Sequence, residues 1–246
     1  MSFTRHLLTA TTLALALTST AHADTQEKKT ITVGISVGST EKIFDVVKKV
    51  AARDGLEIKL VKFNDYQLPN AALNAGDLDA NAFQHKPFLD NQIKARGFDI
   101  VPVGLTVTAP LGFYSRKIKS LNDLPEGASV GIQNDPSNGN RALRLLAAYK
   151  LITLKPEAEE KNNATPSDVV SNPRKLKLVP LDAAQLPRSL DDLTAASINN
   201  DYATQAGLEP ARDAIGREAA NGPYANIIAV RTKDRDQPWV KKLVAA

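Results

Sequence analysis

The chain has 246 residues, a length that suits one or two domains with a substantial core, and a formal net charge of +4. Acidic and basic residues are mixed along the sequence, so there is no clustered basic face of the kind that binds nucleic acid. Cysteine is absent, which excludes disulfides, thiolate chemistry and cysteine-ligated metals.

Residues 1–23 have the pattern of a secretory signal peptide. Arg5 supplies the positive charge, an apolar run covers residues 7–17, and Ala-His-Ala at residues 21–23 matches a cleavage site. The apolar run is too short to span a bilayer. Because no cysteine is present to carry the lipid of a bacterial lipoprotein, we expect export to the periplasm as a soluble protein.

The mature chain begins with a strand, a helix and a second strand. Residues 31–37 alternate as a strand, a helix follows from Gly38 to Gly55, and residues 56–61 form the next strand. This order predicts parallel pairing with a right-handed crossover. Ligands of such sheets bind beyond the carboxyl ends of the strands, where Gly38 and Tyr66 lie. Gly38 by itself equally suits a plain turn.

Residues 63–90 carry an unusual group of aromatic side chains. Pro69 and Gly76 bound a short helix, residues 78–84 form a strand, and a helix begins near Lys86. Each aromatic taken alone suits the core, and a lone histidine suits the surface. Their position at element ends favours convergence on a cleft. The group consists of Tyr66, Phe83, His85 and Phe88.

A second region begins after the strand expected at residues 99–108. Pro110 to Gly112 interrupts that strand, so we expect the first crossover between lobes there. A strand at residues 128–132 leads into a polar, turn-rich loop and then a helix, with Arg141 in the first turn of that helix. Backbone N–H groups and a guanidinium together predict a carboxylate site with two parallel hydrogen bonds. The alternative is a solvated helix arginine.

The remaining elements place two asparagines at strand boundaries. Asn199 ends a strand and Asn226 begins one; each alone suits a turn. With Arg141 and the aromatic group they predict a zwitterion site, in which the amide oxygens accept an ammonium and the aromatic rings contact an apolar or thioether side chain. The expected segments are short helices at 165–168, 186–193 and 202–206, strands at 176–181, 195–198 and 226–231, and a last helix at 238–244.

Several long motifs in order resemble the MetQ/NlpA family, the methionine-binding proteins of bacterial ABC importers. The resemblance covers residues 30–246 and implies a two-lobed α/β fold like that of periplasmic binding proteins, with the ligand cleft between the lobes and two crossover segments. The motifs are FNDYQLPNAALNAGDLDANAFQHKPFLD, NDPSNGNRALRLL, ATPSDVV, LPRSLDDL, INNDYATQAGLEP and PYANII.

The resemblance implies that methionine is the ligand and the permease of an ABC importer the partner. It implies one lobe of residues 24–111 plus 226–246 and another of residues 112–225. We expect a monomer that is not an enzyme and needs no cofactor or metal. Phe88 stands where the family usually has tyrosine. The expected ligand-binding residues are Tyr66, Phe83, His85, Phe88, Arg141, Asn199 and Asn226.

Other functions remain open on this sequence. The same fold could bind another small amino acid, a methionine-containing peptide or a metal ion, or serve in adhesion. Removal of residues 1–23 leaves His85 as the sole histidine, which is poor provision for zinc or manganese. A serine hydrolase would have to use that histidine, and the sequence has no G-x-S-x-G motif.

Overall fold

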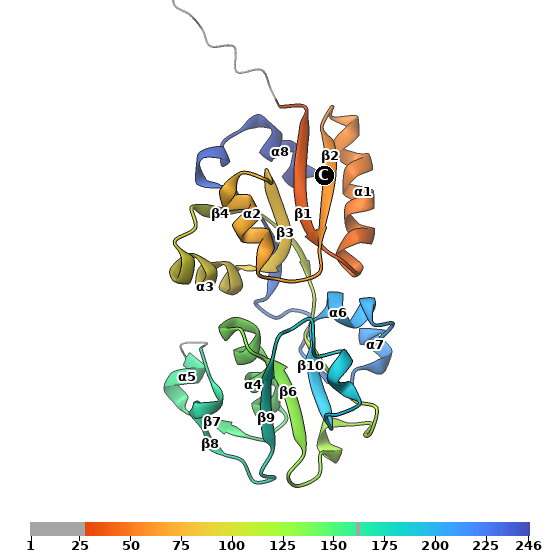
Figure 1. Cartoon of the computed structure of the whole chain (residues 1–246), viewed down its shortest axis with the longest axis vertical. Coiled ribbons are helices and arrows are strands. Elements are labelled where there is room, and N and C mark those ends of the chain that lie inside the picture. The colour runs from red at the N-terminus through yellow and green to blue at the C-terminus, as the bar shows by residue number, and fades with distance from the viewer. Residues whose placement is uncertain (1–27, 161–162) are drawn as a thin grey trace, which may run out of the picture.

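The structure is a computed structural model that describes residues 28–160 and 163–246. The signal peptide expected at residues 1–23 lies outside the described residues. Two five-stranded sheets, each covered by helices, form two lobes that follow one another along the long axis of the molecule (Figure 1). The expected α/β class is therefore confirmed.

The first sheet joins strands from both ends of the chain, in the order β2-β1-β3-β12-β4. β1 pairs in parallel with β2 and β3, as the strand–helix–strand pattern predicts. β12 runs antiparallel between β3 and β4. The strands are β1 (Thr30–Ser36), β2 (Glu57–Phe63), β3 (Ala80–His85), β4 (Ile100–Thr108) and β12 (Ala225–Arg231).

In the described part of the chain, four helices cover this sheet: α1 (Ser39–Arg53), α2 (Leu68–Ala75), α3 (Lys86–Arg96) and α8 (Pro238–Ala245). The sequence punctuation explains their limits. Proline lies in the first turn of α2, α3 and α8, where its missing N–H costs nothing. Gly76 ends α2 in the left-handed conformation. Phe44 and Trp239 pack with the inward-facing residues of β1 in the core.

The second sheet has the order β11-β5-β10-β6-β9. β6 is parallel to β9 and β10, whereas β5 is antiparallel to β10 and β11. Its strands are β5 (Gly112–Tyr114), β6 (Ser129–Gln133), β9 (Lys177–Leu181), β10 (Ala195–Ile198) and β11 (Gly216–Arg217). A small separate sheet pairs β7 (Thr153–Leu154) with β8 (Val169–Ser171).

The helices of this second lobe are α4 (Pro136–Ala148), α5 (Pro156–Glu160), α6 (Asn200–Gln205) and α7 (Pro210–Asp213). Single 3₁₀ turns occur at Leu121–Asp123, Pro166–Asp168, Arg188–Leu190 and, in the first lobe, Thr232–Asp234. Leu143 and Leu146 of α4 pack on Val130 and Ile132 of β6 in the core.

Two expectations about helices were wrong. The loop expected after β6 is largely helix: α4 begins at Pro136, because Asp135 caps it by accepting the N–H of Asn138 at 2.9 Å. Arg141 therefore lies in the second turn of α4. The helix expected at residues 186–193 is only a 3₁₀ turn at Arg188–Leu190.

The chain crosses between the lobes twice, from β4 to β5 and from β11 to β12. The lobes also touch directly, with α6 facing the end of the first lobe where α1 begins (Figure 1). Among residues 28–160 and 163–246, no helix is both long and apolar enough to cross a membrane.

Candidate functional site

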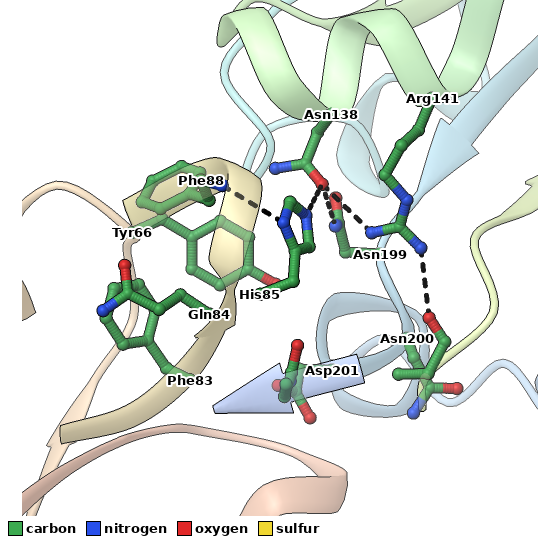
Figure 2. Close-up of a pocket in the computed structure, with 12 residues that line it drawn as sticks. Tyr66, Phe83, Gln84, His85, Phe88, Asn138, Arg141, Asn199, Asn200 and Asp201 are labelled. Atoms are coloured by element: carbon green, nitrogen blue, oxygen red, sulfur yellow. Dashed lines mark hydrogen bonds between the residues drawn. The ribbon is translucent and has the colours of Figure 1, made fainter. Parts of the chain in front are cut away.

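A cavity lies between the lobes, with about 390 Å³ of space that is partly open to solvent. All seven candidate residues predicted from the sequence line it. Figure 2 labels Tyr66, Phe83, His85, Phe88, Arg141 and Asn199. The residues that line the cavity without having been predicted are Gln84, Ala109, Asn138, Asn200 and Asp201.

Aromatic rings form one wall of the cavity. β3 ends with Phe83 and His85, and the first turn of α3 adds Phe88. The Phe83 and Phe88 rings meet edge to face at 5.9 Å, and Tyr66 lies within 6.0 Å of both. Burial raises the pKa of Tyr66 well above its usual value, so its phenol is neutral. This wall suits an apolar or thioether side chain.

His85 has one definite tautomer. Its Nδ1 accepts the backbone N–H of Phe88 at 3.2 Å and therefore carries no proton. The proton is on Nε2, which donates to Oδ1 of Asn138 across the lobe boundary at 3.2 Å. Burial, together with the positive charge of Arg141, lowers the pKa of His85 to about 3. The ring is a neutral hydrogen-bond donor.

Three donors converge on Oδ1 of Asn138 (Figure 2). Besides His85, Nδ2 of Asn199 donates to it at 3.0 Å and Nη1 of Arg141 at 3.3 Å. A carbonyl oxygen has only two lone pairs, so the neutral amide oxygen of Asn138 cannot fully satisfy all three donors. Such a cluster favours an anionic oxygen of a ligand. Asp135 fixes the orientation of the Asn138 amide, because its two carboxylate oxygens accept hydrogen bonds from Nδ2 of Asn138 at 3.0 and 3.2 Å.

The sequence contained a usable signal for Asn138. A helix that begins at Asp135-Pro136 places Asn138 and Arg141 three residues apart on one face. Interpreting the polar stretch as a loop hid this relation.

Arg141 differs from the expectation in its partner. Its parallel donors Nε and Nη2 bind Glu218 at 3.0 and 2.6 Å, a buried bidentate ion pair. Nη2 also donates to the carbonyl of Ala109 at 3.2 Å, and the guanidinium stacks on Tyr224 at 4.3 Å. Only Nη1 is directed at the cluster around Asn138. No local signal in the sequence marked Glu218, which is 77 residues away along the chain.

The two predicted asparagines differ in whether their side chains have hydrogen-bond partners within the protein. Asn199, the N-cap residue of α6, is held by Gln133, whose Nε2 donates to its Oδ1 at 2.8 Å. Asn226 lies opposite His85 in the β12–β3 register. Its side chain makes no hydrogen bond with the described residues. The free amide oxygen of Asn226 is therefore the better placed acceptor for a ligand N–H.

A network of buried amide side chains joins β3, the strand that carries Phe83 and His85, to α2. Gln84 exchanges two hydrogen bonds of 2.7 Å with Asn70, which anchors α2 to β3. Asn81 forms hydrogen bonds with both residues, at 2.9 and 3.0 Å.

Groups of three or more potential metal ligands are absent from the described part of the chain.

Known proteins resemble this chain closely. A model of the NlpA lipoprotein family matches residues 31–246. The D-methionine-binding lipoprotein MetQ of Escherichia coli K12 is 49% identical over 226 residues, which cover 91% of this chain and 83% of the relative. Outer membrane lipoprotein 3 of Mannheimia haemolytica is 46% identical over 92% of this chain and 85% of its own length.

Solved structures agree in fold. A nutrient-binding protein of Burkholderia cenocepacia, described as bound to methionine, is similar with a TM-score of 0.85 and 56% identity, over 87% of this chain and 90% of that one. The methionine-binding protein MetQ is similar with a TM-score of 0.85 and 49% identity, over 88% and 89%. The expected periplasmic-binding-protein-like fold is confirmed.

The expected location was wrong. The matched family and the curated relatives are named lipoproteins, which indicates association with a membrane through a lipid and not a soluble protein. The expectation rested on the signal-peptide pattern, an apolar run too short to span a bilayer and the missing cysteine. A missing attachment residue rules out one chemical linkage and does not decide where the protein resides.

Proposed function

Since the chain belongs to the NlpA lipoprotein family, we propose that it captures methionine between its lobes and delivers it to an ABC importer. Its relatives are named as binding proteins and not as enzymes. The observation that carries the proposal is a cavity between the lobes that combines an aromatic wall with a cluster of hydrogen-bond donors suited to a carboxylate.

The donors determine the orientation of the ligand. Nη1 of Arg141 and the N–H groups around Asn138 bind the carboxylate. The ammonium donates to Oδ1 of Asn226 and to the second lone pair on Oδ1 of Asn199. The thioether then lies against the rings of Tyr66, Phe83 and Phe88. Sulfur–aromatic contacts contribute about 0.3–1.5 kcal/mol.

The proposed delivery follows from the lobed architecture. We assign residues 24–111 with 226–246 to one lobe and 112–225 to the other, a division that the membership of the two sheets supports. Ligand binding favours the closed arrangement because only that arrangement brings both sets of contacts together. The monomeric closed protein then presents both lobes to the permease.

Calorimetric titration tests this function. L-Methionine should bind with a dissociation constant in the micromolar range or below, and norleucine, which lacks sulfur, up to about tenfold more weakly. Phe83→Ala should cost roughly 2 kcal/mol, as for a buried anchor. Leu105→Ala is the control, because Leu105 is 74% exposed and outside the cavity. Undetectable binding of L-methionine, D-methionine and short methionine peptides to the unaltered protein would refute the proposal.

A further inference from the structure

The first turn of α1 lacks a capping side chain of its own. Its N-cap residue is Gly38, and only the backbone N–H of Gly38 is served locally, by Glu41 at 3.1 Å. The free N–H groups at the start of a 15-residue helix attract negative charge. A side-chain acceptor must therefore come from elsewhere in the molecule.

That acceptor is Asp201, which belongs to α6 in the other lobe. Its Oδ1 accepts the backbone N–H of Thr40 at 3.2 Å and the hydroxyl of Ser39 at 2.5 Å. The hydroxyl of Thr40 donates to both carboxylate oxygens, at 3.1 and 3.0 Å. Asn200 adds a hydrogen bond of 2.9 Å from its Nδ2 to Ser39. The cap of α1 is thus completed only across the lobe boundary.

The carboxylate of Asp201 is buried without an ion pair. The residue is 6% exposed, and no salt bridge in the described ranges includes it. Besides the donors of α1, only its place in the first turn of the short helix α6 favours its charge. An isolated buried carboxylate is strongly unfavourable unless hydrogen bonds and dipoles serve it. Opening the cleft would remove these donors from Asp201 and the acceptor from α1 together.

The backbone at Gly38 is shaped for this contact. A Cβ atom there would lie 2.5 Å from the carbonyl oxygen of Asp201, and the residue has a φ of +104°. Glycine alone combines this conformation with so close an approach. Nearby, the rings of Tyr66 and Tyr202 also meet across the boundary, at 4.7 Å.

We propose that Asp201 is a positioning residue that sets the affinity for the ligand by holding the lobes closed through the first turn of α1. It raises the fraction of molecules in the binding-competent arrangement, and apparent affinity rises with that fraction. The identity of the ligand in this inference rests on the proposed function, whereas the effect of Asp201 on closure is present without ligand. Asp201 also lines the cavity, so direct contact with the ligand ammonium is the competing role.

Closure is measured first, in the absence of ligand. Because the sequence has no cysteine, Val46→Cys and Val170→Cys introduce a unique label pair on two 58% exposed sites, one in each lobe. Distance distributions from spin labels should show fewer closed molecules in Asp201→Ala, and an intermediate fraction in Asp201→Asn, whose amide oxygen still accepts. Saturating L-methionine should close all variants. Equal ligand-free distributions in the unaltered protein and Asp201→Ala would overturn the proposal.

Affinity is measured next, with two ligands. Asp201→Ala should weaken binding by about 2- to 30-fold, the factor equivalent to losing a helix cap. The loss should be equal for L-methionine and for 4-(methylthio)butanoate, which is methionine without its ammonium. A loss confined to L-methionine would assign Asp201 to the ligand and overturn the positioning role.

A double-mutant cycle and a control complete the test. Thr40→Val with Ser39→Ala removes the two hydroxyl donors but leaves the backbone N–H of Thr40, so it should reproduce part of the loss and add nothing to Asp201→Ala. Additive losses would contradict the proposal. Asp168→Asn is the matched control, because Asp168 caps a turn within one lobe by accepting from Thr165. If the unaltered protein bound no methionine, the ligand-free distances would still decide the role of Asp201.

Discussion

At the residue scale, Arg141 connects the cavity to the crossover segments. Glu218 holds its Nε and Nη2 and also accepts the backbone N–H of Leu111 at 2.9 Å. Ala109, in the same crossover, accepts a further bond from Nη2. In the proposed orientation, a ligand carboxylate at Nη1 would be joined through one guanidinium to the first crossover between the lobes.

Arg141→Ala should remove most of the binding free energy that the protein gains from the ligand carboxylate. The change leaves that carboxylate and Glu218 both buried without a cation, so a loss of about 2–5 kcal/mol, roughly 30-fold to several-thousand-fold, is expected. Titration with L-methionine and methioninamide measures it: the unaltered protein prefers the acid, and the variant should not. Arg144→Ala is the control, since Arg144 is exposed and donates to Glu159. A variant that retained the full preference for the acid would place the carboxylate elsewhere.

His85 should make stability depend on pH. Its pKa is about 3 in the folded protein and near 6.5 when unfolded, so protons favour the unfolded chain. Stability present above pH 6.5 is lost as the pH falls towards 3. Between pH 7 and pH 5 the free energy of unfolding should fall by about 2 kcal/mol more than in His85→Gln. Urea denaturation at both pH values measures this, and parallel changes in the two proteins would contradict it.

At the element scale, the start of α4 orders the donor cluster. Asp135 caps the helix and holds the amide of Asn138 with the same carboxylate, so that Oδ1 points towards His85, Arg141 and Asn199. The helix that carries the arginine thus also orients the group that its Nη1 contacts.

Asp135→Ala should therefore affect both stability and binding. Loss of the cap is expected to cost about 0.5–2 kcal/mol of unfolding free energy, and the freed Asn138 should weaken methionine binding as well. Asp168→Ala removes a comparable cap away from the cavity and should affect stability alone. Denaturation and titration of both variants provide the comparison. Unchanged methionine affinity in Asp135→Ala would show that the orientation of Asn138 is immaterial.

At the scale of the whole molecule, the cavity belongs to neither lobe alone. The aromatic wall comes from the first sheet and its helices, whereas Asn138, Arg141 and Asn199 come from the second lobe. Ligand binding should stabilise both lobes together.

Differential scanning calorimetry tests this coupling. Free methionine at 100 times its dissociation constant should stabilise the protein by about 2.7 kcal/mol, which shifts the transition temperature upward by roughly 5–10 °C. The heat-absorption peak should move as a whole. Displacement of only part of the peak would mean that one lobe binds the ligand by itself.

The sequence alone determined the features that depend on near neighbours in the chain. Pro69 and Gly76 mark the limits of α2 because proline and glycine act on their own backbone. The grouping of Phe83, His85 and Phe88 follows from the end of one strand and the start of the next helix. These patterns, with the long motifs, were sufficient for the fold class, the family and seven side chains of the cavity.

Only the tertiary structure decided which groups face one another. Arg141 and Glu218 are 77 residues apart, and Thr40 and Asp201 are 161 apart. Neither pair has a periodicity or a local partner that would reveal it. They meet because sheet register and the closure of two lobes bring distant segments together, and the energies of such contacts depend on a burial that no local pattern encodes. The carboxylates of Glu218 and Asp201 therefore entered the site only through the fold.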